Sequence, residues 1–137
     1  MILVPAMIKI THLKPEFKDT RGAITRILNE PEFKIRAILR ITQKAGTIRG
    51  NHYHKKDYHW VYCESGRFRY YEKNMKVKSG RVISVILKPG DLVLSHPHIA
   101  HAMEALVDTV FWAITTEKRQ QANYETDTVR LNIVGKK

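Results

Sequence analysis

The sequence predicts an all-β fold, a sandwich or barrel of short strands. Runs rich in Val, Ile, Tyr, Phe and Trp recur at roughly ten-residue spacing, with turn residues between them. No stretch forces a helix longer than about two turns. The chain has 137 residues, enough to bury a single core. We therefore expect residues 1–137 to form one domain.

The expected elements follow from alternation and from turn signals. Residues 1–20 contain Pro5 and Pro15, so we expect an extended arm with one short strand. Residues 34–42 alternate apolar and basic side chains, which predicts a half-buried strand. Residues 109–115 are apolar on both faces and should be buried on both. The same signals predict further strands at 23–28, 67–72, 82–87, 92–95 and 127–134, and one turn of helix within 117–125.

Three histidines lie close together in the stretch from Gly46 to Gly66. His52 and His54 are two residues apart, so on a strand both imidazoles point to the same face. A bend at residues 55–57 and a second strand would return His59 to that face. Neutral imidazole is the commonest protein ligand for borderline divalent ions, so this arrangement predicts a metal site.

The spacing of these residues resembles the first motif of the cupins. The match comprises Gly46, His52, His54, His59 and Gly66, with His59 where most cupins have glutamate. The second cupin motif is matched by Pro89-Gly90-Asp91 and by His101. The chain departs from that motif at three positions: His96 replaces proline, His98 replaces glycine and Ala105 replaces asparagine.

This resemblance spans roughly residues 35–115. It implies a double-stranded β-helix, the jelly-roll barrel of cupins, with the histidines inside near one mouth. It also implies a homodimer, because family members commonly pair and the arm at residues 1–20 needs a surface to pack on.

The metal prediction is one divalent ion held by four imidazoles, those of His52, His54, His59 and His101. Four neutral ligands would leave the ion its full charge as a Lewis acid. Nitrogen donors suit zinc, nickel, copper or ferrous iron better than magnesium or calcium, and manganese also stays open. We expect no other cofactor-binding residues.

A second resemblance concerns the substrate. Arg49-Gly50-Asn51-His52 looks like the RGxH element of cupin sugar-nucleotide enzymes. These are the 3,5-epimerases and 3,4-ketoisomerases of dTDP-4-keto-6-deoxysugars and the cupin domain of capsule-synthesis reductase–epimerases. The resemblance implies catalytic roles for Arg49 and His52, and a sugar-nucleotide epimerase or isomerase of surface-polysaccharide synthesis.

The two resemblances conflict over His52, because a metal ligand has no lone pair left to act as a general base. If metal binds, the base must be a different residue. The sequence leaves five alternatives open: Tyr53, Tyr62, His96, His98 and Glu104. Two other functions also stay open, a metal-dependent iron oxygenase and a non-catalytic small-molecule-binding cupin. With no DNA-binding domain attached, we do not expect a transcription factor.

The formal charge of +11 is unevenly placed. Residues 34–81 hold 13 Lys and Arg against three acidic residues, a net of +10. This excess favours an anionic partner such as the diphosphate of a nucleotide sugar, although a solvated sheet face explains the charge equally well. We do not expect nucleic-acid binding.

Composition also bears on the compartment. No apolar run approaches the roughly 18 residues of a membrane span, so no membrane partner is expected. Cys63 is the only cysteine, which excludes an internal disulfide and fits a reducing compartment. We expect a cytoplasmic protein.

Overall fold

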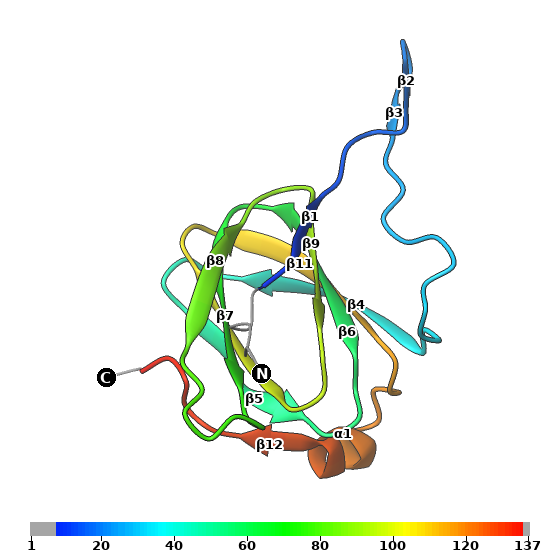
Figure 1. Cartoon of the computed structure of the whole chain (residues 1–137). Helices are drawn as coiled ribbons and strands as arrows, with labels where there is room; N and C mark the ends of the chain where they lie inside the picture. Colours follow the sequence, from blue (N-terminus) through cyan, green and yellow to red (C-terminus); the bar gives the residue numbers. More distant parts are fainter. Residues whose placement is uncertain (1–7, 136–137) are drawn as a thin grey trace, which may run out of the picture.

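Two antiparallel sheets face each other in the computed structural model, which describes residues 8–135 (Figure 1). The first sheet has the strand order β1 (Ile10–His12), β9 (Asp91–Ser95), β6 (His59–Ser65), β11 (Thr109–Thr115) and β4 (Ala37–Gln43). The second has the order β12 (Thr128–Arg130), β5 (Ile48–His54), β10 (Ile99–Ala105), β7 (Phe68–Asn74) and β8 (Ile83–Leu87).

Consecutive strands lie in opposite sheets from β4 to β7 and again from β8 to β12. At each of these connections the chain passes from one sheet to the other, so both sheets are built from antiparallel strands that enclose one core. This alternation is the double-stranded β-helix, and it confirms the predicted jelly-roll barrel.

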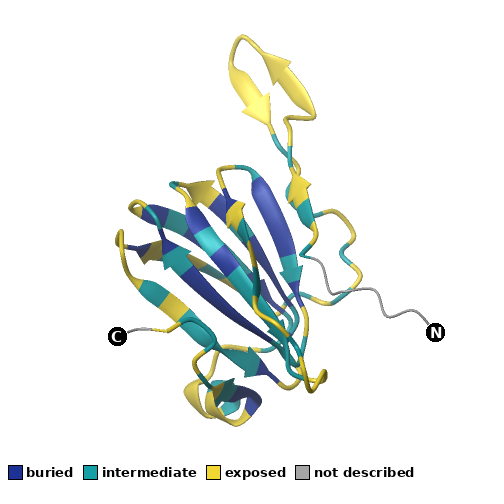
Figure 2. Ribbon diagram, turned by 60° about the vertical axis from the view of Figure 1, so that its left-hand side comes forward, coloured by how far each residue is buried: buried dark blue, intermediate teal, exposed yellow. Residues whose placement is uncertain are grey.

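The space between the sheets is filled by apolar side chains over part of its length. The buried cluster comprises Val61, Cys63, Phe68, Tyr70, Leu87, Val93, Met103 and Phe111. Figure 2 shows how buried and less buried residues alternate along the strands, as expected when each strand turns one face inward.

A second cluster covers the outer face of the first sheet. Its buried members are Trp60, Leu92 and Ile114, and the segment before β4 packs on them through Ile27, Leu28, Phe33 and Ile35. Strand β11 therefore buries Phe111 on its inner face and Ile114 on its outer face. This confirms the prediction that residues 109–115 are covered on both sides.

The N-terminal region extends well beyond the barrel. Of the expected arm, residues 1–7 lie outside the described part of the chain, and β1 pairs with β9. Strands β2 (Phe17–Asp19) and β3 (Gly22–Ile24) form a hairpin that projects from the barrel (Figure 1). The predicted strand at 23–28 thus ends at Ile24, because the following residues pack on the outer cluster instead of pairing.

The C-terminal region closes one end of the barrel. Helix α1 (Gln121–Asp127) falls largely within the stretch where one helical turn was expected, and β12 is shorter than the predicted strand at 127–134. No helix within residues 8–135 is long and apolar enough to cross a membrane.

Strand β10 was not predicted, since its sequence is rich in alanine and carries little strand signal.

Candidate functional site

Strand β5 contains a bulge in the middle of the Arg49-Gly50-Asn51-His52 segment. Opposite it on β10, His101 pairs with His52 but Ala102 pairs with Gly50, so Asn51 is the extra residue. Gly50 and Asn51 both have positive φ, +85° and +57°. A Cβ at Gly50 would lie 2.8 Å from the carbonyl oxygen of His101, so only glycine fits this close approach.

The bulge changes which side chains face the barrel interior. Arg49 and His52 are three residues apart, and in a regular strand they would point to opposite faces. With the extra residue, Arg49 pairs with Met103, which is buried in the inner cluster on the same face as His101. Arg49 and His52 therefore both face inward.

The structure brings the four predicted metal ligands together. His52 and His54 lie on β5, His59 begins β6 and His101 lies on β10. The ring centres of His101 lie 4.7 Å from His52, 5.5 Å from His54 and 4.8 Å from His59. Two overlapping groups of donor atoms are close enough to hold an ion, and they share His54: His52, His54 and His101, and His54, Asp57 and His59.

Three of the imidazoles are held through Nδ1. That atom of His59 lies 3.0 Å from Asp57 Oδ2, and that of His54 lies 3.3 Å from both Asp127 Oδ2 and Thr128 Oγ1. In His101 it lies 3.2 Å from Ser95 Oγ. Partners on Nδ1 orient the rings and leave Nε2 as the donor toward a shared centre, the arrangement common around metal-bound histidines.

Burial keeps the imidazoles of His52, His54 and His101 neutral. It lowers the pKa of His52 to about 4 and that of His54 to about 3, with nearby His59 adding to both effects. Burial also places the pKa of His101 well below its usual range. At neutral pH their lone pairs are therefore available for a metal ion or a proton.

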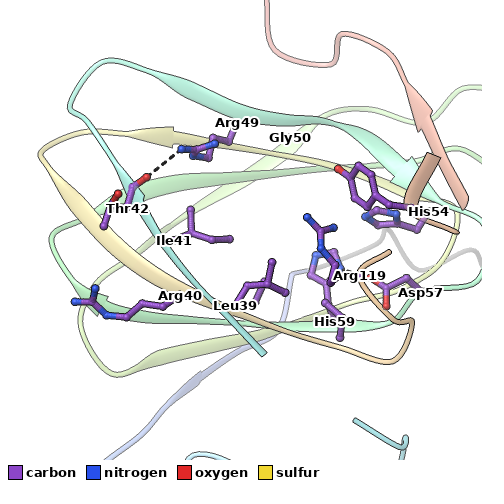
Figure 3. A pocket seen from close by; sticks show the side chains of 13 residues that line it. Leu39, Arg40, Ile41, Thr42, Arg49, Gly50, His54, Asp57, His59 and Arg119 are labelled. Carbon is purple, nitrogen blue, oxygen red and sulfur yellow. Dashed lines mark hydrogen bonds and ion pairs between the residues drawn. The ribbon is translucent and has the colours of Figure 1, made fainter. Parts of the chain in front are cut away.

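A cavity of about 440 Å³ opens beside the imidazoles (Figure 3). This volume is within the roughly 300–1,000 Å³ usual for small-molecule sites. His54 and His59 line one part of the cavity, and Arg49 lines another. The remaining wall comes from Leu39, Ile41, Thr42, Ala113, Thr115, Arg119 and Tyr124, with Gly50, Asp57 and part of Arg40.

The arginines around the cavity differ in their partners. Arg40 is turned away from it and forms a two-pronged contact with Glu64, at 3.0 Å for each pair of atoms. Arg49 donates to the carbonyl oxygen of Thr42 at 3.1 Å, and the guanidinium of Arg119 lies 4.2 Å from the ring centre of Tyr124. Within residues 8–135, neither Arg49 nor Arg119 contacts a carboxylate, so both can receive an anion.

Of the predicted site residues, His52 and His101 do not line the cavity, and within residues 8–135 none of the five alternative bases does either. The ring of Tyr53 lies beside His98, and that of His96 lies beside Tyr58. Tyr62 packs on the outer cluster, and Glu104 accepts a hydrogen bond from Tyr71.

Sequence reasoning missed several site residues. Asp57, two residues before His59, carried a readable signal, because a carboxylate beside a strand-end histidine is a natural partner for Nδ1. Asp127 and Thr128 carried one only through the similarity of this dipeptide to the capsule-synthesis cupins, and Arg119 and Tyr124 carried none. Only the packing of α1 and β12 against β5 brings these residues here.

Fold and site together define a cupin-type barrel with an imidazole-lined ligand cavity. The chain belongs to the AraC-like ligand binding domain family, which matches residues 37–116, from the start of β4 to just beyond β11. No curated protein matches the chain by sequence.

Solved structures with the same fold include sugar-nucleotide enzymes. The sugar 3,4-ketoisomerase QdtA of Thermoanaerobacterium thermosaccharolyticum, in complex with TDP, superposes with a TM-score of 0.73 at 22% identity, covering 90% of this chain and 87% of QdtA. A 3,4-ketoisomerase from Helicobacter canadensis gives 0.71 at 17%, covering 90% of each chain. The 3,5-epimerase RmlC of Legionella pneumophila gives 0.74 at 16%, covering 90% of this chain and 71% of RmlC. At these identities the likeness establishes the fold.

Proposed function

We propose that this protein is a sugar-nucleotide isomerase or epimerase of surface-polysaccharide synthesis that acts beside a keto group. The observation that carries this proposal is the bulge in β5, which turns Arg49 and His52 toward the same interior. Two solved structures of the same fold contain ligands of this class. A QdtA variant was solved with TDP-4-keto-6-deoxyglucose, and RmlC of Legionella pneumophila with dTDP-4-keto-L-rhamnose. The proposed substrate is accordingly a nucleotide-linked 4-keto-6-deoxyhexose.

The arginines supply the anion-binding part of the proposed site. Among the described residues 8–135, the Arg49 side chain makes one hydrogen bond and Arg119 is held by stacking on Tyr124, so both guanidiniums keep free donors. A guanidinium binds phosphate oxygens through a planar fork of donors. We assign the diphosphate or the developing oxyanion to Arg49, and a further phosphate contact to Arg119.

The imidazoles supply the proton-transfer part. Isomerisation beside a ketone requires removal of a proton from the neighbouring carbon, and a neutral imidazole accepts it at physiological pH. His52 is the acceptor that the RGxH element favours, and its lowered pKa keeps it unprotonated. A cationic side chain near the ketone oxygen stabilises the enolate that forms.

A divalent ion fits the same imidazoles. The lowered pKa values of His52, His54 and His101 and the partners on three Nδ1 atoms are features of a metal-binding donor set. We propose that His54, His59 and His101 hold one such ion, and that His52 is the fourth ligand if it does not serve as the base, because its one lone pair can fill only one of these roles. When bound, it would supply a Lewis acid for the carbonyl oxygen.

Hydrogen exchange tests the reaction. A dTDP-4-keto-6-deoxyhexose incubated with the protein in deuterated water should gain deuterium at a carbon beside the carbonyl, detected by mass spectrometry. Arg49→Ala should slow this exchange roughly a hundredfold without changing the folded state. Exchange that survives the loss of both Arg49 and His52 contradicts the assignment. A substrate that binds without exchanging points to a non-catalytic ligand-binding domain.

Metal analysis tests the ion and the role of His52. Protein purified without chelators or nickel resin should contain close to one ion per chain, and His59→Ala or His101→Ala should weaken its binding. His52→Asn separates the two roles of that residue. Loss of exchange with the metal retained marks a base, whereas loss of both marks a ligand.

We also propose a homodimer in the cytoplasm. The hairpin of β2 and β3 stands off the barrel with Phe17 49% and Ile24 59% exposed, and these two residues pair across it. A second copy of the chain would cover them. Light scattering should give twice the chain mass, and the double variant Phe17→Asp/Ile24→Asp should shift it toward the monomer. A monomeric mass for the unmodified protein contradicts the proposal.

A further inference from the structure

Asp57 and His59 form a buried pair at the turn between β5 and β6. Their exposed fractions are 5% and 6%, and Asp57 Oδ2 lies 3.0 Å from His59 Nδ1. The cavity beside them is lined by His59, and within residues 8–135 its Nε2 has no hydrogen-bond partner. The pair therefore has one nitrogen facing a carboxylate and one facing the cavity.

The other oxygen of Asp57 is fully engaged. Asp57 Oδ1 accepts hydrogen bonds from the amides of Thr116 and Glu117, at 3.0 and 3.2 Å, and from Thr116 Oγ1 at 3.3 Å. These three donors fix the carboxylate in one orientation, with Oδ2 directed toward His59. Asp57 is thus held as an acceptor-only carboxylate.

An ionised carboxylate only accepts hydrogen bonds, so His59 must carry its hydrogen on Nδ1. His54 Nδ1 also faces a carboxylate, Asp127 Oδ2, at 3.3 Å, whereas the Ser95 hydroxyl beside His101 can donate or accept. Asp57 makes the shorter of the two carboxylate contacts, at 3.0 Å.

We propose that Asp57 is a positioning residue that fixes His59 in the Nδ1–H tautomer and presents its Nε2 lone pair to the cavity. His59 stands where most cupins have glutamate. The Asp57 carboxylate behind it therefore supplies a negative charge near this position, but the His59 ring lies between that charge and the proposed metal site. A carboxylate behind a ligating imidazole raises its basicity. The use of the lone pair in the active site rests on the proposed function, whereas the tautomer does not.

Nitrogen NMR of histidine-labelled, metal-free protein tests the tautomer directly. Long-range ¹H–¹⁵N correlations recorded at pH 8 distinguish Nδ1–H from Nε2–H. The His59 signals are assigned with His59→Gln. We expect Nδ1–H in the unmodified protein. An Nε2–H form there overturns the proposal without any further variant.

Asp57→Asn is the matched substitution. Its amide oxygen can still accept from Thr116 and Glu117, while its NH₂ group donates toward His59, so the tautomer should reverse to Nε2–H. Asp108→Asn is the control, because Asp108 accepts only from the Ala45 amide, at 2.9 Å, and does not contact the imidazoles. An unchanged His59 tautomer in folded Asp57→Asn also overturns the proposal.

Zinc titration of the same proteins gives a second readout. Loss of a carboxylate behind a ligand typically weakens metal binding about 10- to 100-fold. We expect a loss of this size for Asp57→Asn and none for Asp108→Asn. If the unmodified protein binds no zinc but shows the Nδ1–H tautomer, the metal proposal fails and the positioning role stands.

Discussion

The barrel interior has an apolar half and an imidazole half, and the same strands build both. On β6 the inward residues run from His59 to Val61 and Cys63. On β10 they run from His101 to Met103 and Ala105. Along each of these two strands, the inward-facing side chains change from histidine to apolar residues within two positions.

The two halves are held together differently. Phe68, Phe111 and their neighbours fill the apolar half by packing, which needs no directional partner. In the imidazole half, buried nitrogens need hydrogen-bond partners, and Asp57, Ser95, Asp127 and Thr128 supply them. The apolar half thus provides stability. The imidazole half provides lone pairs for a ligand, and its buried rings need hydrogen-bond partners at defined positions.

Truncation in the apolar half should have the largest effect on stability. Phe111 is fully buried in the inner cluster, and Phe111→Ala should lower the free energy of unfolding by about 3–5 kcal/mol, measured by chemical denaturation. Val77→Ala, at an exposed side chain outside the hairpin, serves as the control and should cost far less. Equal losses of unfolding free energy in the two variants would contradict the claim that packing in the apolar half supplies the stability.

Acid should destabilise the imidazole half first. The unfolded chain takes up protons on histidine below about pH 6.5, whereas folded His52 and His54 stay neutral down to about pH 4 and about 3. The unfolded state therefore binds more protons in this window, and the stability of metal-free protein falls as pH drops. The expected slope is about 1.4 kcal/mol per pH unit for each such imidazole.

Denaturation of chelator-treated protein at pH 7 and pH 5.5 measures this loss. Asp57, whose pKa is lowered from 3.8, adds to it only below that window. The double variant His52→Gln/His54→Gln should show a flatter profile. Stability that is constant or rises on acidification would show that these histidines are not held neutral.

A substitution at the bulge in β5 should lower both stability and ligand affinity, although Gly50 is only half-buried. Gly50→Ala places a Cβ against the carbonyl oxygen of His101 and forces a side chain onto a φ of +85°. We expect a loss of about 1–3 kcal/mol and a displaced Arg49, seen as weaker binding of dTDP. Unchanged dTDP affinity would contradict a role of Arg49 in binding this ligand.

The smallest expected effect is at His98, a further residue with positive φ, in the turn before β10. Its φ is +63°, and it occupies the position where the cupin pattern has glycine. His98→Gly relieves this backbone and should change stability by less than about 1 kcal/mol, in either direction. A large loss would reveal a role for the imidazole that its contact with Tyr53 does not explain.

The sequence alone predicted the barrel and its histidine cluster because both depend on local spacing. A period of two along a strand places His52 beside His54, and the turn at residues 55–57 brings His59 back to them. Turn residues at regular intervals separated the strands, so most of them were expected within a few residues of their observed bounds. These features follow from backbone geometry that neighbouring residues control.

Tertiary structure alone decided the inward turn of Arg49 and the shell around the imidazoles. A regular strand period would place Arg49 on the face opposite His52, and only the pairing of β5 with β10 shows that Asn51 is an extra residue. Asp127 reaches His54 because α1 leads into β12, which pairs with β5. The physical reason is that register and docking depend on contacts between residues far apart in the chain, which local periodicity does not encode.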